Sequence, residues 1–283
     1  MAVIAQVKKD MEFYKGLSSL LKVLKGIAVT QFHILERKIH TFDKFSDSVQ
    51  NFLGGIEIGD VAHPFLNPTV DHQAVIAVTS DSGLLGGLNM QVMTLAFEQL
   101  KSKHDMLLVL GERGKIYARE QHFSYVGFPG IKEEERIDLA LTLRDYVLER
   151  VVDGKIGFVN IIYPRALSLI VQRIEHLSIL PYGVSAQEQE VRLLNLNEFI
   201  MESSLDNIVE YLIYLWFGQR LFEIFGEARL AELAARFIHL EESSQRLEEL
   251  EKKLKLKYFR LRHELTDRSM RELFAARSLY GTK

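Results

Sequence analysis

The sequence has no cysteine, no proline outside residues 64–181 and no apolar run long enough to cross a membrane. The missing cysteine excludes a disulfide framework, a cysteine nucleophile and a thiolate metal site, and it suits a reducing compartment. The most apolar window, residues 208–225, carries Glu210, Arg220 and Glu223, so we expect any membrane association to be peripheral. The first residues lack the apolar core of a signal peptide, and we expect a cytoplasmic protein.

An excess of one charge is also missing. Lysine and arginine total 35 against 38 for aspartate and glutamate, which gives a formal net charge of -3. The whole-chain balance therefore gives no argument for nucleic acid or an anionic membrane surface as a partner. With 47% hydrophobic residues in 283, the chain can bury a sizeable core and is not disordered.

Glycine and proline are absent between Gly226 and Gly281, where apolar residues recur every three or four positions. This spacing predicts one amphipathic helix over 230–280, roughly 75 Å long at 1.5 Å per residue. The stretch from Leu17 to Phe52 has the same spacing. We expect the two helices to pair as an antiparallel coiled coil; the alternative is that both are ordinary core helices of a bundle.

All five prolines and most glycines lie between these helical stretches. Apolar runs typical of buried strands occur at 73–79, 106–110, 123–128, 156–162 and 167–174, the last two as a possible hairpin across Pro164 and Arg165. Helical patterns occur at 90–100, from near Gly114, and at 133–151 with Glu133, Glu134 and Glu135 as an acidic first turn. Strands that alternate with helices predict an open, mainly parallel α/β sheet.

The fold class that follows is α/β plus a long antiparallel coiled coil. We expect an N-terminal shaft helix over 1–60, a Rossmann-like open α/β domain over 61–195, and C-terminal shaft helices over 196–283 that pair with the first. Residues 187–197 are polar and predict a loop. A helix over 205–217 is predicted to break at Gly218 or Gly226 before the long shaft begins.

The turn SDSGLLGGLN at residues 80–89 is the first candidate site, because backbone amides in a glycine-rich turn before a helix can bind an anion. It lacks the lysine of a Walker A loop and the spacing of a dinucleotide fingerprint, so a tight strand-to-helix turn is the simpler interpretation. His239 and Glu242 could share a metal, but a second ligand pair is missing, and we predict no metal site. No combination of residues predicts a catalytic site.

Charge is unevenly distributed along the long helix. Seven acidic residues lie from Glu227 to Glu251, and nine cations follow from Lys252 to Arg277. A solvated helix face is one interpretation, and a basic tip that enters an acidic protein collar is another. DNA binding is a third, disfavoured because aromatic stacking residues and a larger basic face are lacking.

Three motifs carry a resemblance to a known family. The turn at 80–89 looks like S-D-R-G-L-C-G-G-x-N, with departures at Ser82 and Leu85. Residues 231–236, AELAAR, are similar to S-E-x-A-A-R, and the pattern continues ungapped to Glu272. Residues 199–203, FIMES, resemble Y-x-Y-E-P. With these motifs and its helix, α/β, helix layout, the chain resembles the gamma subunit of F-type ATP synthases, the central rotor stalk.

The likeness is that of a divergent member. The basic N-terminal motif expected near residues 8–20 is poorly kept, His263 stands where the family has glutamine, and Ala275 and Ala276 replace a glycine pair. The redox-cysteine insertion of photosynthetic versions is absent.

The resemblance implies a non-catalytic rotor that turns inside a hexamer of three alpha and three beta subunits and biases each catalytic site on beta. It implies one copy per complex, contacts with an epsilon-type subunit and the membrane c-ring, no nucleic acid, and a position on the cytoplasmic face of a bacterial plasma membrane. No cofactor is expected on this chain, while the complex uses ATP or ADP, phosphate and Mg²⁺.

The resemblance also assigns residues to contacts. Contacts to the beta collar are expected from Lys25, Ile27, Arg262, His263, Arg268 and Glu272. Contacts at the foot, against the ring, are expected from Phe199, Met201 and Glu202. The family's turn motif is expected at Ser80, Asp81, Gly83, Gly86, Gly87 and Asn89.

Two other functions stay open from the residues alone. A nucleotide-binding α/β enzyme with a coiled-coil appendage would bind ATP or NAD at the glycine-rich turn. A coiled-coil scaffold or nucleic-acid tether would use the basic stretch from Lys252 to Arg262.

Overall fold

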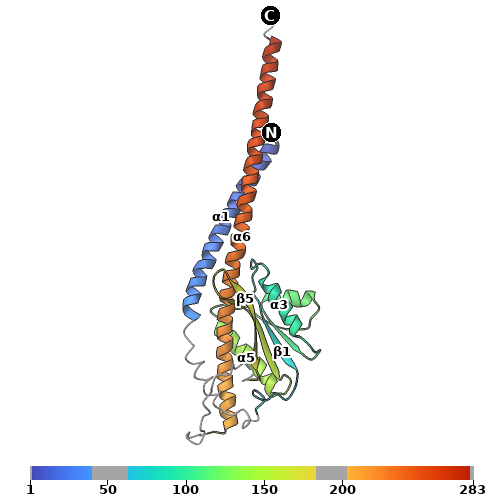
Figure 1. The fold of residues 1–283 in the computed structure, drawn as a ribbon, viewed down its shortest axis with the longest axis vertical. Coiled ribbons are helices and arrows are strands. Elements are labelled where there is room, and N and C mark those ends of the chain that lie inside the picture. The colour runs from blue at the N-terminus through green and yellow to red at the C-terminus, as the bar shows by residue number, and fades with distance from the viewer. Residues whose placement is uncertain (1, 40–62, 183–202, 281–283) are drawn as a thin grey trace. The chain divides into compact units, whose positions relative to one another are not determined.

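The structure, a computed structural model, describes residues 2–39, 63–182 and 203–280 (Figure 1). The chain divides into two compact units, one of residues 1–28 with 237–283 and one of residues 29–236. The first unit is a pair of helices. The second contains a five-stranded sheet with helices packed on it.

The helical pair is built from the N-terminal part of α1 (Ala2–Ile39) and the C-terminal part of α6 (Leu205–Tyr280). Lys25 forms an ion pair with Glu241, and Lys22 lies 3.7 Å from Glu248, so the two helices run antiparallel. Apolar side chains fill the seam between them: Tyr14, Leu17, Leu21, Leu24, Leu240 and Leu247. The predicted antiparallel pairing is confirmed here, and the predicted helical positions 42–52 lie outside the described residues.

Helix α6 is continuous over 76 residues, so the predicted break at Gly218 or Gly226 is wrong. At Gly218 the reason is close packing: a Cβ atom there would lie 3.2 Å from Cδ of Arg144. Glycine at this point makes room for a neighbouring side chain, and the helix passes through because packing outweighs its low helix propensity.

The sheet has five strands in the order β3-β2-β1-β4-β5. Their bounds are β1 (Gln73–Val78), β2 (Met106–Leu110), β3 (Val126–Phe128), β4 (Phe158–Ala166) and β5 (Gln172–Leu180). The first four are parallel, with Val75 opposite both Leu107 and Asn160, and β5 runs antiparallel to β4. The predicted open, mainly parallel sheet is confirmed.

Helices cover both faces of this sheet. The connecting helices are α3 (Leu88–Gln99), α4 (Glu112–Glu120) and α5 (Arg136–Val152). Helices α3 and α4 pack on the face that carries Val75, Ala77 and Val109. Helix α5 and residues 209–228 of α6 pack on the other face, where they bury the larger apolar core. The first part of α6 is therefore a layer of the α/β domain.

Three predicted boundaries moved. The β4–β5 hairpin forms, but its turn lies at 167–171, and Pro164 is inside β4 opposite Ile174. On the β1 side of the strand, pairing ends at Ile162, so β1 does not require the missing N–H of Pro164. The three glutamates at 133–135 precede α5 instead of forming its first turn. Strand β3 is also shorter than predicted.

Candidate functional site

The C-terminal part of α6 exposes every residue from Arg262 to Arg277. Met270, Leu273 and Phe274 are spaced three and four apart, so they lie on one helix face, and Leu273 and Phe274 are each 65% exposed. A long helix with an uncovered apolar face gains little from its own propensity, since most helical stability in proteins comes from packing that face. This segment therefore has the surface of a helix that another molecule covers.

Helix α1 carries a second apolar stripe besides the one in the seam. Phe13, Leu20 and Ile27 follow each other at intervals of seven residues, and all three are exposed, as is Val23. Other residues of α1, including Tyr14 and Leu21, pack against α6 in the seam. This part of α1 thus presents apolar surface on two sides, and only one side is covered by α6.

The predicted collar residues are not gathered at one place. Lys25 is tied to Glu241 across the seam, and Ile27 is exposed close by. Arg262 lies 21 residues beyond Glu241 on α6 (262 - 241), roughly 30 Å along a helix that rises 1.5 Å per residue. The candidates therefore form two levels along the helical pair.

One level contains Lys25 and Ile27, and the other contains Arg262, His263, Arg268 and Glu272. In the second level, the structure brings two predicted residues into contact. Arg268 donates to Glu272 at 2.9 Å, one helical turn away. Arg262 and His263 lie exposed next to each other in sequence.

The glycine-rich turn is held by its own side chains. The backbone N–H of Ser80 donates to Oδ1 of Asn89 at 3.1 Å, and Nδ2 of Asn89 donates to Oγ of Ser80 at 2.9 Å. Oδ1 of Asp81 accepts the backbone N–H of Glu112, at the start of α4, at 2.9 Å. Gly86 has φ of 59°, in the region that favours glycine. The turn interpretation of 80–89 fits this geometry better than the anion site does.

The two other glycines of the motif lie where the turn meets the neighbouring helices. A Cβ atom on Gly83 would lie 3.0 Å from Nη2 of Arg113, and Gly87 immediately precedes α3. The motif thus joins β1, α3 and α4.

An ionic cluster around a buried carboxylate links this turn to α6. Glu232 is 6% exposed and forms ion pairs with Arg229 and with Arg236, the latter at 2.6 Å. Oγ of Ser82 donates to Glu232 at 3.1 Å and accepts from Nη2 of Arg236 at 2.6 Å. We call Ser82, Arg229, Glu232 and Arg236 the Glu232 joint. The AELAAR motif contains two of its members, but sequence reasoning assigned neither of them a role.

The Glu232 joint lies where open α/β sheets usually bind ligands, at the carboxyl ends of strands next to a reversal of strand order. Here the reversal falls between β1 and β4. The cavity at this point, bounded by Thr79, Pro164, Ala228 and Glu232 among others, has a volume of only about 10 Å³. That volume holds at most one water molecule, so α6 fills the position that a nucleotide would need.

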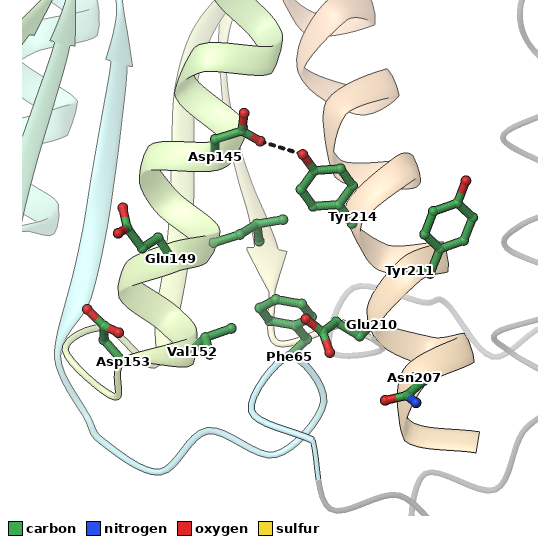
Figure 2. Close-up of a pocket in the computed structure, with 10 residues that line it drawn as sticks. Phe65, Asp145, Glu149, Val152, Asp153, Asn207, Glu210, Tyr211 and Tyr214 are labelled. Carbon is green, nitrogen blue, oxygen red and sulfur yellow. Dashed lines mark hydrogen bonds between the residues drawn. The ribbon is translucent and has the colours of Figure 1, made fainter. Parts of the chain in front are cut away.

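A larger, open groove of about 620 Å³ lies between α5 and the start of α6 (Figure 2). Its floor is apolar and includes Phe65, and four carboxylates line it: Asp145, Glu149, Asp153 and Glu210. In Figure 2, Asp145 from α5 and Tyr214 from α6 point toward each other, and the Tyr214 hydroxyl donates to Oδ1 of Asp145 at 2.9 Å. Sequence reasoning missed this groove because its residues come from separate segments.

Electrostatics in the groove follow from these contacts. Burial opposes ionisation of Asp145, but hydrogen bonds from Arg144 and Tyr214 outweigh it and hold the pKa of its carboxyl below the usual value. The hydrogen bond to Asp145 raises the pKa of Tyr214 in turn. Burial lowers the pKa of His63, which lies 3.8 Å from Glu210. The Arg144 guanidinium also stacks on the Tyr214 ring, 3.6 Å from its centroid.

The predicted foot residues Phe199, Met201 and Glu202 lie outside the described residues, as does the predicted loop at 187–197. Within the part of the chain that the structure describes, no helix is long and apolar enough to span a membrane. In that same part, His, Cys, Asp and Glu side chains form no cluster of three or more that could hold a metal ion.

Comparison with known proteins gives one family. A profile of the family described as ATP synthase matches residues 4–276. The ATP synthase gamma chain of Clostridium acetobutylicum is 30% identical over 213 residues, which are 72% of this chain and 71% of the relative. The gamma chain of Clostridium beijerinckii is 23% identical over 269 residues, 92% of each chain.

Solved structures agree on the fold. A chain in the cryo-EM structure of the Euglena gracilis mitochondrial ATP synthase, comprising OSCP, F1 and c-ring, has a TM-score of 0.72 at 15% identity. The match covers 99% of this chain and 95% of that one. A chain of the rotor from the same organism has a TM-score of 0.67 at 16% identity, with 94% and 99% covered.

Proposed function

This chain belongs to the ATP synthase family, as a gamma chain, and from that premise we propose that it turns as the central rotor of an ion-translocating ATP synthase. The chain itself is a non-catalytic subunit. We propose that its partners are a hexamer of three alpha and three beta subunits, an epsilon-type subunit and a membrane c-ring, with one copy of this chain per complex. The complex would use ATP or ADP, phosphate and Mg²⁺, and this chain would bind no cofactor.

One observation carries this proposal: the uncovered helix from Arg262 to Arg277. Its apolar face of Met270, Leu273 and Phe274 needs a partner. The segment carries four arginines against three acidic residues, and this small cationic excess suits a socket with acidic walls. A single helix in a ring of three beta subunits presents a different face to each one. Each beta site then meets different contacts, which is the differential interaction needed to bias three identical sites toward different affinities.

The relatives' names support the same partners. The Euglena structure is described as containing F1 and a c-ring, and the bacterial relatives are gamma chains of Clostridium species. We therefore propose a peripheral position on the cytoplasmic face of a bacterial plasma membrane. The predicted foot contacts Phe199, Met201 and Glu202 would face the ring.

Native mass spectrometry of the tagged chain, recovered from gently solubilised source membranes, tests the assembly. The expected result is a complex with one copy of this chain for three copies of each of two nucleotide-binding subunits. A lone chain or a homo-oligomer, with those subunits present in the extract but unbound, would overturn the proposal.

Charge reversal tests the collar contact. We expect Arg262→Glu to lower the number of ions pumped per ATP, because an exposed cation that meets an acidic wall becomes a repulsive anion, while the complex still assembles. Lys253→Glu is the matched control, since it makes the same charge change at another exposed position of α6. Ion uptake and ATP hydrolysis are measured in parallel on reconstituted vesicles; unchanged pumping per ATP in Arg262→Glu contradicts the assignment.

A further inference from the structure

The contact between the α/β domain and α6 changes character along the helix. From Val209 to Phe225, α6 packs on the sheet with large apolar side chains such as Phe217 and Trp216. Further along, the buried residues of α6 are mostly small: Ala228, Ala231, Ala234 and Ala235. Leu233 is the large apolar exception, and it packs in a cluster with Phe32 and Leu35 of α1. Apolar burial is not directional, and alanines interlock little with a facing surface. The alanines therefore do little to fix the rotation of the helix about its own axis, and a directional contact at this point has a larger effect.

The Glu232 joint supplies a directional contact at that place. Its carboxylate is buried, and both of its oxygens accept hydrogen bonds: one from Arg229, the other from Arg236 and Ser82. The two arginines belong to α6 itself, whereas Ser82 belongs to the turn between β1 and α3. Hydrogen bonds to a charged group are short and depend strongly on angle, so this contact defines the orientation of the helix against the turn.

The position of the joint adds to its effect. Glu232 lines the small cavity at the crevice where open α/β sheets bind ligands. The domain thus contacts α6 at the sheet edge where related sheets bind ligands. The hydrogen bonds of Ser80, Asn89 and Asp81 hold the backbone of the turn in place. A force on the domain is therefore transmitted to Ser82.

We propose that Glu232 is a positioning residue that locks the rotation of α6 to the α/β domain, so that torque applied to the domain reaches the end of the helix. This inference rests on the proposed rotor function. It assigns Ser82 and Arg236 as the bridge between turn and helix, and Arg229 as the group that holds the second carboxylate oxygen.

The test uses the whole complex reconstituted in vesicles. Glu232→Gln removes the charge and keeps the shape, and Glu232→Ala removes the contact. Because Ser82 and the two partly exposed arginines lose the buried carboxylate that they share, we expect ions pumped per ATP to fall by about two-fold or more in Glu232→Ala and less in Glu232→Gln. ATP hydrolysis should persist. The control Glu242→Gln changes an exposed acid on the same helix and should pump normally.

Rescue separates a lock from a general loss of stability. We expect Arg236→Ala to lower pumping, and Ser82→Arg in that background to restore it, because a guanidinium from the turn then reaches the same carboxylate. Ser82→Arg places an arginine at the third position of the turn motif, where the family pattern S-D-R-G-L-C-G-G-x-N has arginine. Normal pumping in Glu232→Ala overturns the lock. The lock is also overturned if Arg236→Ala lowers pumping, Ser82→Arg does not restore it, and the purified variant chains unfold at the same temperature as the unmodified chain.

These outcomes differ from a failure of the rotor function itself. If the unmodified chain is never found with nucleotide-binding subunits, the rotor proposal fails whatever Glu232 does. If the complex forms and pumps, and the Glu232 variants pump equally well, only the lock fails.

Discussion

The α/β domain and the helical pair satisfy their apolar surfaces in opposite ways. The domain buries its large side chains in cores of its own, and Phe217 and Phe225 are fully inaccessible to solvent. The helical pair buries one narrow seam and leaves Phe13, Leu273 and Phe274 about two-thirds exposed. Both regions contain phenylalanine and leucine in helices, so composition does not explain the difference. The two regions differ in the number of helices and strands available to cover each apolar face.

This difference separates what the chain needs to fold from what it needs to act. A self-contained domain is stabilised by contacts that the chain makes with itself, whereas uncovered apolar faces gain their stability from a partner. The helical pair thus leaves apolar surface uncovered when the chain is alone, which is consistent with the rotor role proposed above.

The largest expected difference in stability between the two regions comes from replacing one phenylalanine in each. Phe217→Ala leaves a cavity in the domain core and should lower the free energy of unfolding by about 3–5 kcal/mol. Phe274→Ala removes an exposed ring and should change it by less than about 0.5 kcal/mol in the isolated chain. Urea unfolding followed by circular dichroism measures both; similar losses at the two positions would mean that the isolated chain covers Phe274.

A smaller effect is expected within the seam of the helical pair. Ser244 is 4% exposed and its hydroxyl has no hydrogen-bond partner among the described residues, whereas the neighbouring Ser243 is partly exposed. Ser→Ala raises helix propensity at both positions, so the difference between the two variants reports burial alone. We expect Ser244→Ala to stabilise the chain by about 1 kcal/mol more than Ser243→Ala does, measured by thermal unfolding. Equal effects would indicate that water reaches the hydroxyl.

Sequence periodicity predicted the elements that depend on local pattern. The long helices, the parallel strands and the helices between them follow from apolar spacing, which acts within one turn or one strand. The break at Gly218 failed because glycine was interpreted as a breaker, while the structure uses it to admit Arg144 from another helix. The Pro164 turn failed for a similar reason, since the tolerance of proline there depends on how far β1 extends.

The candidate sites show the same limit. Motif likeness identified the turn at 80–89 and the AELAAR stretch separately, but the contact between Ser82 and Glu232 spans 150 residues and no periodicity reports it. The acidic groove of Figure 2 likewise combines α5, α6 and Phe65. The collar residues were predicted by likeness alone, and the antiparallel register then separated them into two levels, a consequence that follows only once Lys25 is known to face Glu241.

The smallest effect concerns that pair. A double-mutant cycle of Lys25→Ala and Glu241→Ala should give a coupling of about 0.5 kcal/mol at neutral pH, because both side chains are partly exposed. The hydrogen bond from Lys25 and its charge hold the pKa of Glu241 below its ordinary value of 4.5. A depressed pKa in the folded state means that the coupling is complete above 4.5 and is lost as pH falls through the lower, folded-state value. The more exposed pair of Lys22 and Glu248, 3.7 Å apart, is the matched control and should couple more weakly. A coupling that persists in strong acid would show that the interaction does not depend on the Glu241 charge. A larger coupling for the control would contradict the expected effect of solvent exposure.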